Sequence, residues 1–179
     1  MKVLLHICCA PCTIYTLKSL RSEGIDVTGY FYNPNIHPLT EFRKRLITLE
    51  NYANITLLPL AVDKEYKLES FLQGALEGGE DRCLFCYETR LNKAFQKAVD
   101  DRVDAVTTTL LYSKYQRHDN IKEIGEELAD TYKMRFLYRD FRVGWRDGIE
   151  ESKRINMYRQ QYCGCIFSER DRYKETQCL

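Results

Sequence analysis

The sequence has no excess of charge of either sign, because 27 Lys and Arg residues stand against 26 Asp and Glu residues, a net charge of +1. This balance excludes a globally basic nucleic-acid-binding domain, so a nucleic-acid partner would need a local basic patch. No window approaches the ~18 apolar residues of a membrane span. The apolar run from Val3 to Ile7 is interrupted by His6 and is shorter than a secretory signal requires. We therefore predict a cytoplasmic protein that does not bind membranes.

Internal repeats, low-complexity segments and Gly/Ser-rich linkers are also missing from the 179 residues. The length fits one domain and is sufficient to bury a core. Hydrophobic residues make up 44% of the chain and charged residues 30%, values that are typical of folded proteins and exclude extensive disorder. We expect a single domain over 1–179, with a cysteine-bearing C-terminal segment at 160–179.

Short apolar segments alternate with segments of helical periodicity along the chain. Strands are expected at 3–7, 27–32, 56–60, 104–110 and 135–138, and helices at 11–23, 38–54, 65–76, 82–99, 120–132 and 147–160. This alternation predicts an α/β fold with a parallel sheet and helices on both faces. In such sheets ligands bind beyond the carboxyl ends of the strands.

Cysteine is the residue that the sequence has in excess: there are eight, and seven of them form three short groups. The groups are Cys8-Cys9-Ala10-Pro11-Cys12, Cys83-Leu84-Phe85-Cys86 and Cys163-Gly164-Cys165, whereas Cys178 stands apart and is expected to have no role. In the cytoplasm, grouped cysteines indicate metal or redox chemistry more often than disulfides. One zinc ion needs only four ligands, whereas an iron–sulfur cluster with a second metal or redox function uses all seven cysteines. The spacing therefore favours iron–sulfur chemistry and leaves a structural zinc site as the alternative.

The three groups differ in their local geometry. Cys83 and Cys86 lie near the N-terminal end of a predicted helix, whose dipole favours thiolates. Adjacent side chains in a strand face opposite ways, so Cys8 and Cys9 share one centre only where the first strand gives way to a loop. The short Cys163-Gly164-Cys165 tether suits a redox-active dithiol or two ligands to a further metal.

Two other regions are candidates for binding a nucleic acid. The segment 107–117 follows the fourth predicted strand, and its candidate substrate-binding residues are Tyr112, Ser113, Tyr115, Gln116 and Arg117. They offer aromatic rings for base stacking and polar groups for phosphates. Residues 135–174 hold ten Lys and Arg against six acidic residues, with Trp145, Tyr158, Tyr162 and Tyr173 among them. An RNA-binding patch and an ordinary solvated surface both explain this composition.

Four motifs together resemble the QueH family of epoxyqueuosine reductases: HICCAPC at 6–12, RCLFCYETR at 82–90, TTTLLYSKYQ at 107–116 and YCGCIFS at 162–168. The resemblance implies the last step of queuosine synthesis, a two-electron deoxygenation of the epoxide of epoxyqueuosine at the wobble position of a tRNA. It also implies a [4Fe–4S] cluster, an external low-potential electron donor, and an adenine-nucleotide α-hydrolase-like (HUP) three-layer sandwich. ATP-using members of that fold group carry a glycine-rich loop after the first strand. This chain has CCAPC there, which disfavours phosphate binding because Pro11 removes a backbone donor.

A mechanism that follows from this resemblance as a hypothesis divides the cysteines between two roles. For the cluster we expect Cys8, Cys9, Cys83 and Cys86, and an exchange of one of them with Cys12 or Cys165 is compatible with the motifs. Cys12, Cys163 and Cys165 are the catalytic candidates. Either some of them hold a second, mononuclear iron that binds the epoxide oxygen as a Lewis acid, or Cys163 and Cys165 supply electrons by forming a disulfide. Two other classes stay open: a zinc-stabilised nucleic-acid-binding domain without catalysis, and a thiol–disulfide oxidoreductase that acts on proteins.

Overall fold

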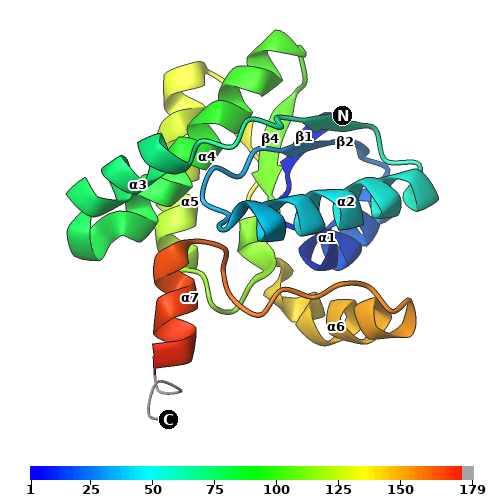
Figure 1. Ribbon diagram of the computed structural model, residues 1–179. Helices are drawn as coiled ribbons and strands as arrows, with labels where there is room; N and C mark the ends of the chain where they lie inside the picture. The colour runs from blue at the N-terminus through cyan, green and yellow to red at the C-terminus, as the bar shows by residue number, and fades with distance from the viewer. Residues whose placement is uncertain (175–179) are drawn as a thin grey trace.

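A five-stranded parallel sheet forms the centre of the molecule (Figure 1). The computed structural model describes residues 1–174. The strands are β1 (Lys2–His6), β2 (Asp26–Phe31), β3 (Leu60–Val62), β4 (Ala105–Thr108) and β5 (Arg135–Phe136), in the order β3-β2-β1-β4-β5. In the register of the central strands, Leu5 of β1 lies between Gly29 of β2 and Thr107 of β4. The predicted α/β class with a parallel sheet is confirmed.

Helices cover both faces of this sheet and complete a three-layer sandwich (Figure 1). Helix α6 packs against α1 and α2 also contacts α1, while α5 and α3 pack against α4. The helices are α1 (Ala10–Ser22), α2 (Leu39–Thr56), α3 (Leu68–Glu77), α4 (Arg82–Asp100), α5 (His118–Tyr132), α6 (Trp145–Arg154) and α7 (Ile166–Tyr173). Three short 3-10 helices are η1 (Gly79–Asp81), η2 (Thr109–Tyr112) and η3 (Phe141–Gly144). None of the described helices has the length and apolar character needed to cross a membrane.

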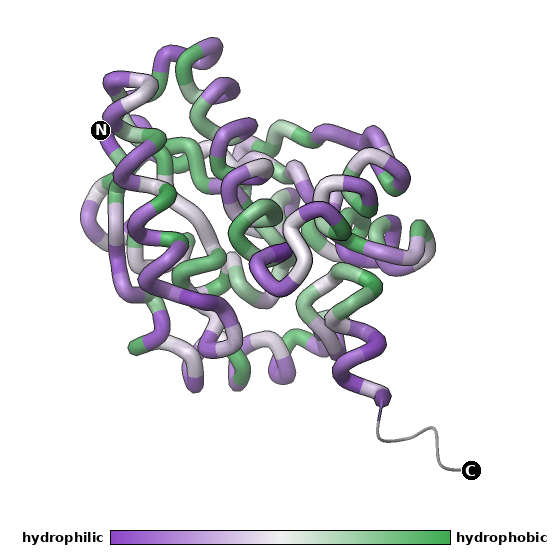
Figure 2. Tube along the Cα trace, turned by 90° about the vertical axis from the view of Figure 1, so that its left-hand side faces the viewer, coloured by the Kyte–Doolittle hydropathy of each residue, from purple (hydrophilic) through white to green (hydrophobic). Residues whose placement is uncertain are grey.

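The core lies between the sheet and its two helical layers. Val3, Leu4 and Leu5 of the central strand are fully buried, as expected for a parallel strand that is covered on both faces. Figure 2 shows hydrophobic segments concentrated in the interior of the trace and hydrophilic segments on the outer turns of the helices. The apolar run that resembled the start of a signal sequence is thus the middle strand of the sheet.

Two segments differ from the sequence predictions. The strand expected at 56–60 is wrong because α2 continues to Thr56 and ends where Leu57 adopts a left-handed conformation (φ 52°). The helix expected at 147–160 ends at Arg154, and Asn156 turns the chain with φ 50°. The chain from residue 157 to Cys165 is irregular, and α7 follows it. Hydrogen bonds from distant residues fix this irregular path, so local periodicity could not reveal it. Cys178 lies outside the described residues.

Candidate metal centre

The strand order reverses between β1 and β4, and the chain segments that leave these two strands meet there. The backbone N–H of Cys8, just after β1, donates a hydrogen bond to Thr109 Oγ1 at 2.9 Å. The same hydroxyl donates to Cys8 Sγ at 3.2 Å. Open α/β sheets bind their ligands at this reversal point, so the first cysteines occupy the position where the fold places a functional site.

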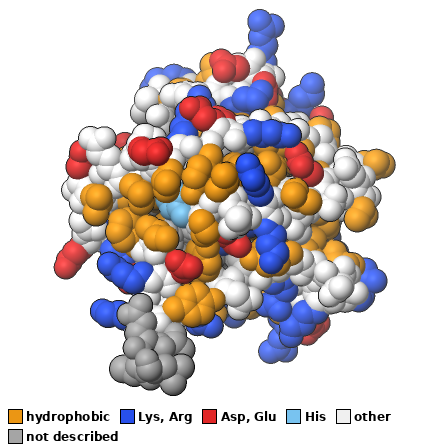
Figure 3. Space-filling view, viewed as in Figure 1, with side chains coloured by type: hydrophobic (Ala, Val, Ile, Leu, Met, Phe, Trp, Pro, Cys, Tyr) orange, Lys and Arg blue, Asp and Glu red, His pale blue; other side chains and the backbone are white. Residues whose placement is uncertain are grey.

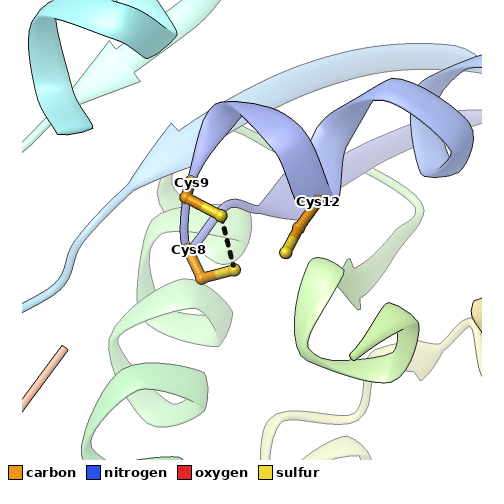
Figure 4. A group of neighbouring side chains, drawn as sticks. All are labelled: Cys8, Cys9 and Cys12. Carbon is orange, nitrogen blue, oxygen red and sulfur yellow. Dashed lines mark hydrogen bonds between the residues drawn. The ribbon is translucent and has the colours of Figure 1, made fainter. Parts of the chain in front are cut away.

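The first thiol group consists of Cys8, Cys9 and Cys12, whose sulfur atoms all lie within 4.8 Å of one another (Figure 4). Cys9 is the N-cap of α1 in an extended conformation, and Cys12 follows one turn later. This break between strand and helix turns Cys8 and Cys9 toward one centre, with their Sγ atoms 3.7 Å apart. Two thiolates on one tetrahedral metal are separated by about 3.8 Å, given metal–sulfur bonds of about 2.3 Å. The first thiol group therefore has the geometry of a three-ligand site for one metal ion.

Protons in the first thiol group are shared unequally. Hydrogen bonds from Cys12 and Cys9 lower the pKa of Cys8 well below its usual value. The hydrogen bond to Cys8 raises the pKa of Cys12, and burial raises that of Cys9. Cys8 is therefore the most acidic thiol of the group. A bound metal would displace the thiol protons, since only thiolates are ligands.

The second thiol group consists of Cys83 and Cys86 in the first turns of α4, and Cys163 and Cys165 between α6 and α7. These four thiols line one small cavity of about 30 Å³ together with Asn35, Phe71, Ala75, Arg82, Tyr87, Gln116 and Phe167. All seven cysteines of the two groups are free. Burial raises the pKa of Cys86 to about 12 and also raises that of Cys83. The structure thus brings the second and third sequence groups together around one space.

A buried arginine on α2 fixes the segment that carries Cys163. Arg45 Nη1 donates to the backbone oxygen of Cys163 at 2.8 Å, and Nη2 donates to that of Tyr162 at 3.0 Å. Its Nε donates to Glu41 Oε1 at 2.6 Å, and only 2% of the Arg45 side chain is exposed. The charge of Arg45 is therefore neutralised within α2, and its remaining donors hold the C-terminal segment against the sheet edge.

Gly164 lies at a tight contact between that segment and the loop after β2. It has φ +142°, and a Cβ atom on it would lie 3.0 Å from Asn35 Nδ2 and 3.2 Å from Arg45 Nη1. Its carbonyl accepts a hydrogen bond from the His37 N–H at 2.8 Å. Only glycine adopts this backbone conformation and leaves this space, so the middle residue of the C-x-C motif sets the position of both neighbouring thiols.

Gln116 lines the cavity of the second thiol group, and Arg117 follows it in the chain. Gln116 Nε2 donates to Cys163 Sγ at 3.3 Å, and its Oε1 accepts from the Tyr87 hydroxyl at 2.9 Å. The Arg117 N–H donates to the same hydroxyl at 3.1 Å, and its guanidinium lies 3.4 Å from Asp81. Both residues thus connect the segment after β4 to the thiols.

Tyr112 is too deeply buried for its ring to stack on a base. It is 2% exposed and supports Trp145, with ring centroids 5.2 Å apart and its hydroxyl donating to the Trp145 carbonyl at 3.1 Å. Tyr115 is instead 85% exposed and lies edge-on to Trp145 with ring centroids 5.8 Å apart. Ser113 Oγ accepts a hydrogen bond from the Tyr115 N–H at 3.3 Å. Of the two tyrosines, only Tyr115 offers an open ring face.

Two tyrosines of the basic region 135–174 are used inside the molecule. Tyr158 and Tyr162 use their hydroxyls internally, on Glu41 Oε2 at 2.6 Å and on the His37 carbonyl at 2.5 Å. In Figure 3, Lys and Arg side chains are interspersed with Asp and Glu side chains around the hydrophobic side chains at the middle of the face. We call Tyr115, Trp145 and Lys114 the aromatic–basic patch, because the Lys114 ammonium also lies 5.8 Å from the Trp145 ring.

Several residues of the site were not expected from the sequence. Arg90 lies one helical turn after Cys86 on α4, and this spacing could have indicated that the two side chains are neighbours. Gln160 donates from Nε2 to Cys9 Sγ at 2.8 Å, and nothing in the local sequence indicates this contact. His37 is 1% exposed and packs between Phe71 and Tyr66. Neither of its ring nitrogens has a hydrogen-bond partner among the described residues.

Comparison with known proteins identifies the family. A model of the family described as Epoxyqueuosine reductase QueH matches residues 3–171. The chain belongs to the QueH family. QueH proteins from three organisms, each named Epoxyqueuosine reductase QueH, show the extent of the similarity. The one from Dehalococcoides mccartyi is 33% identical over 172 residues, covering 96% of this chain and 94% of the relative. Those from Histophilus somni and Thermotoga maritima are 37% and 34% identical, covering 97% and 93% of this chain and 74% and 89% of the relatives.

The residues of this QueH family member fit thiolate-bound metal. Seven free thiols form two groups, and the charge of buried Arg90 interacts with thiols of both, namely Cys86, Cys8 and Cys163. The expected cluster ligands Cys8, Cys9, Cys83 and Cys86 are drawn from both groups, and this assignment stays a prediction. The donor set is the soft sulfur set of iron–sulfur and zinc sites.

Proposed function

We propose that the protein reduces the epoxide of epoxyqueuosine at the wobble position of tRNA and so completes queuosine. In this reaction the substrate takes up two electrons and two protons, both epoxide C–O bonds break, a carbon–carbon double bond forms, and the oxygen leaves as water. The electrons come from an external low-potential donor. Family membership supports the reaction, and the single structural observation that carries it is the gathering of seven free thiols into two groups, with thiols of both groups beside the buried Arg90. The cytoplasmic location expected from the sequence is part of this proposal.

The geometry favours a division of the thiols that revises the sequence-based set. The first thiol group suits one metal ion, because its sulfurs are as close together as ligands of a single tetrahedral centre. The second thiol group, with four thiols around one cavity, suits a [4Fe–4S] cluster. When bound, the cluster would transfer single electrons, and the mononuclear metal would act as a Lewis acid toward the epoxide oxygen.

The chain's own residues position the thiols and the RNA. Thr109, Gln116 and Gln160 donate hydrogen bonds to Cys8, Cys163 and Cys9, which orients the thiols. The aromatic–basic patch offers the Tyr115 ring to an unstacked base, and base stacking on an aromatic ring contributes about 1–3 kcal/mol. Because Gln116 follows Tyr115 directly and lines the cavity, a base held on the patch is delivered next to the thiols.

The proposal is tested by metal analysis and nucleoside analysis on protein purified without oxygen. We expect more than four irons and about four sulfides per chain, and conversion of epoxyqueuosine to queuosine in isolated tRNA supplied with a chemical reductant. Cys8→Ala and Cys86→Ala should abolish conversion. Cys178→Ala is the matched control, because this cysteine belongs to none of the three sequence groups, and it should keep both metal and activity.

The same experiment separates the alternatives. One zinc and no sulfide, with no conversion, would contradict the proposal and favour a zinc-stabilised nucleic-acid-binding domain. Four irons with no further metal, and activity that depends on Cys163 and Cys165 but survives Cys12→Ala, would favour the dithiol route instead of a second metal. Activity of metal-free protein on disulfide substrates would indicate a protein thiol–disulfide oxidoreductase.

A further inference from the structure

Arg90 is a buried cation without a carboxylate partner. Its side chain lies inside the molecule, at 1% exposure, between α4 and the sheet. Nη2 donates to Asn33 Oδ1 at 2.7 Å, Nη1 lies 3.8 Å from Cys86 Sγ, and Nε has no partner among residues 1–174. None of the ion pairs in this part of the chain involves Arg90, whereas Arg45, the other fully buried arginine, is paired with Glu41.

No carboxylate faces Arg90 among the described residues. His6 on β1 is fully buried, with its ring nitrogens on Thr108 Oγ1 and the Tyr32 carbonyl, and an imidazole supplies no negative charge. Asn33, in the loop after β2, is neutral and donates from Nδ2 to the Ile7 carbonyl. The remaining neighbours are the thiols Cys86, Cys8 and Cys163, the groups that raise the pKa of the guanidinium. A buried cation is costly without an anionic partner. The thiols are the groups beside Arg90 that can supply this negative charge, on their own or with a bound metal.

We infer that Arg90 is a positioning residue that supplies the fixed positive charge opposite the thiolate-bound metal centre and raises its reduction potential. This inference rests on the proposed function and deepens it. One-electron reduction adds a negative charge to a centre that the thiolates already make anionic. A buried cation stabilises the reduced form more than the oxidised form, because its attraction grows with the negative charge and is little screened inside the protein. Arg90 thus makes the centre easier to reduce.

The first test is a potentiometric titration of the anaerobically purified protein, followed by electron paramagnetic resonance of the reduced cluster. Arg90→Met should lower the ratio of reduced to oxidised cluster at a fixed potential about tenfold, which corresponds to about 59 mV for a one-electron couple. Arg90→Lys keeps the charge and should recover most of the wild-type ratio. Arg21→Met removes an exposed arginine that binds only carbonyl oxygens at the end of α2 and should leave the ratio unchanged. Equal shifts for Arg90→Met and Arg90→Lys, or no shift for either, would overturn the inference.

The second test needs no redox signal and separates this inference from the proposed function. The thermal midpoints of metal-free and metal-loaded protein are compared for wild type, Arg90→Met and Arg90→Gln. The increase in thermal midpoint on metal loading should be smaller in both variants, because the loaded protein loses the attraction between the guanidinium and the anionic metal centre. An unchanged increase would contradict the role of Arg90. If the native metal proves to be zinc, the reductase proposal fails and this comparison still decides whether Arg90 balances a thiolate-bound metal.

Discussion

Replacement of Gly164 by alanine tests how tightly the C-terminal cysteines are held. At φ +142° an L-residue is strained, which costs about 1–3 kcal/mol. The new Cβ would lie 3.0 Å from Asn35 Nδ2, 3.2 Å from Arg45 Nη1 and 3.2 Å from Ile36 Cγ1. Overpacking of this kind costs about 1–3 kcal/mol more. We therefore expect Gly164→Ala to lower the free energy of unfolding of the metal-loaded protein by about 2–6 kcal/mol.

The measurement is urea unfolding under anaerobic conditions, with iron content determined on the same samples. Gly24→Ala is the matched control, because Gly24 also has positive φ (+72°) but a Cβ on it would meet nothing within 4 Å. The control should lose only about 1–2 kcal/mol from backbone strain and keep its iron. A Gly164→Ala variant that is no less stable than Gly24→Ala, with full iron content, would refute the close contact between the C-x-C motif and the loop after β2.

Three further predictions follow from other parts of the structure. Glu41→Ala leaves the buried Arg45 cation unpaired and should lower the free energy of unfolding by about 3–5 kcal/mol in urea, and the double variant Glu41→Ala/Arg45→Met should recover a large part of this loss. The hydrogen bond from Arg142 lowers the pKa of Asp140 from 3.8 to about 2. This carboxylate therefore stabilises the folded protein above pH 3.8 and ceases to do so as the pH falls toward 2. Acid titration of the single tryptophan's fluorescence should show this transition in wild type, and Asp140→Asn should lack it. Tyr115→Ala should weaken binding of the substrate tRNA about 5- to 150-fold in a filter-binding assay, while Tyr115→Phe, which keeps the ring, should bind like wild type; equal losses in both would exclude stacking.

Much of the fold followed from local pattern. The apolar segment before Cys8 could be predicted as a central strand because a parallel strand covered on both faces is apolar throughout. The proximity of Cys8, Cys9 and Cys12 could also be predicted, since the tether between them is short. The site therefore begins where the sequence placed it, at the carboxyl end of β1.

What the sequence did not reveal depends on contacts between distant segments. Tyr112 was expected to bind substrate, but Trp145, from another part of the chain, covers it. The convergence of Cys163 with Cys86 depends on the irregular path that Arg45 fixes through two backbone carbonyls. Neither charge balance nor periodicity reports such pairings, because both are summed over neighbours along the chain rather than in space.

The contact between Gln160 and Cys9 spans 151 positions of the chain and has a consequence for biogenesis. During synthesis the first thiols emerge from the ribosome long before the residues that close the site over them. Until residues 160–165 dock, Cys8, Cys9 and Cys12 are accessible to oxidants and to competing metals. Loop closure over so long a separation comes late in folding. We therefore expect cells to load the second thiol group only after residues 160–165 have been synthesised and have docked, and chains that stall before this segment to be the form most readily damaged by oxygen.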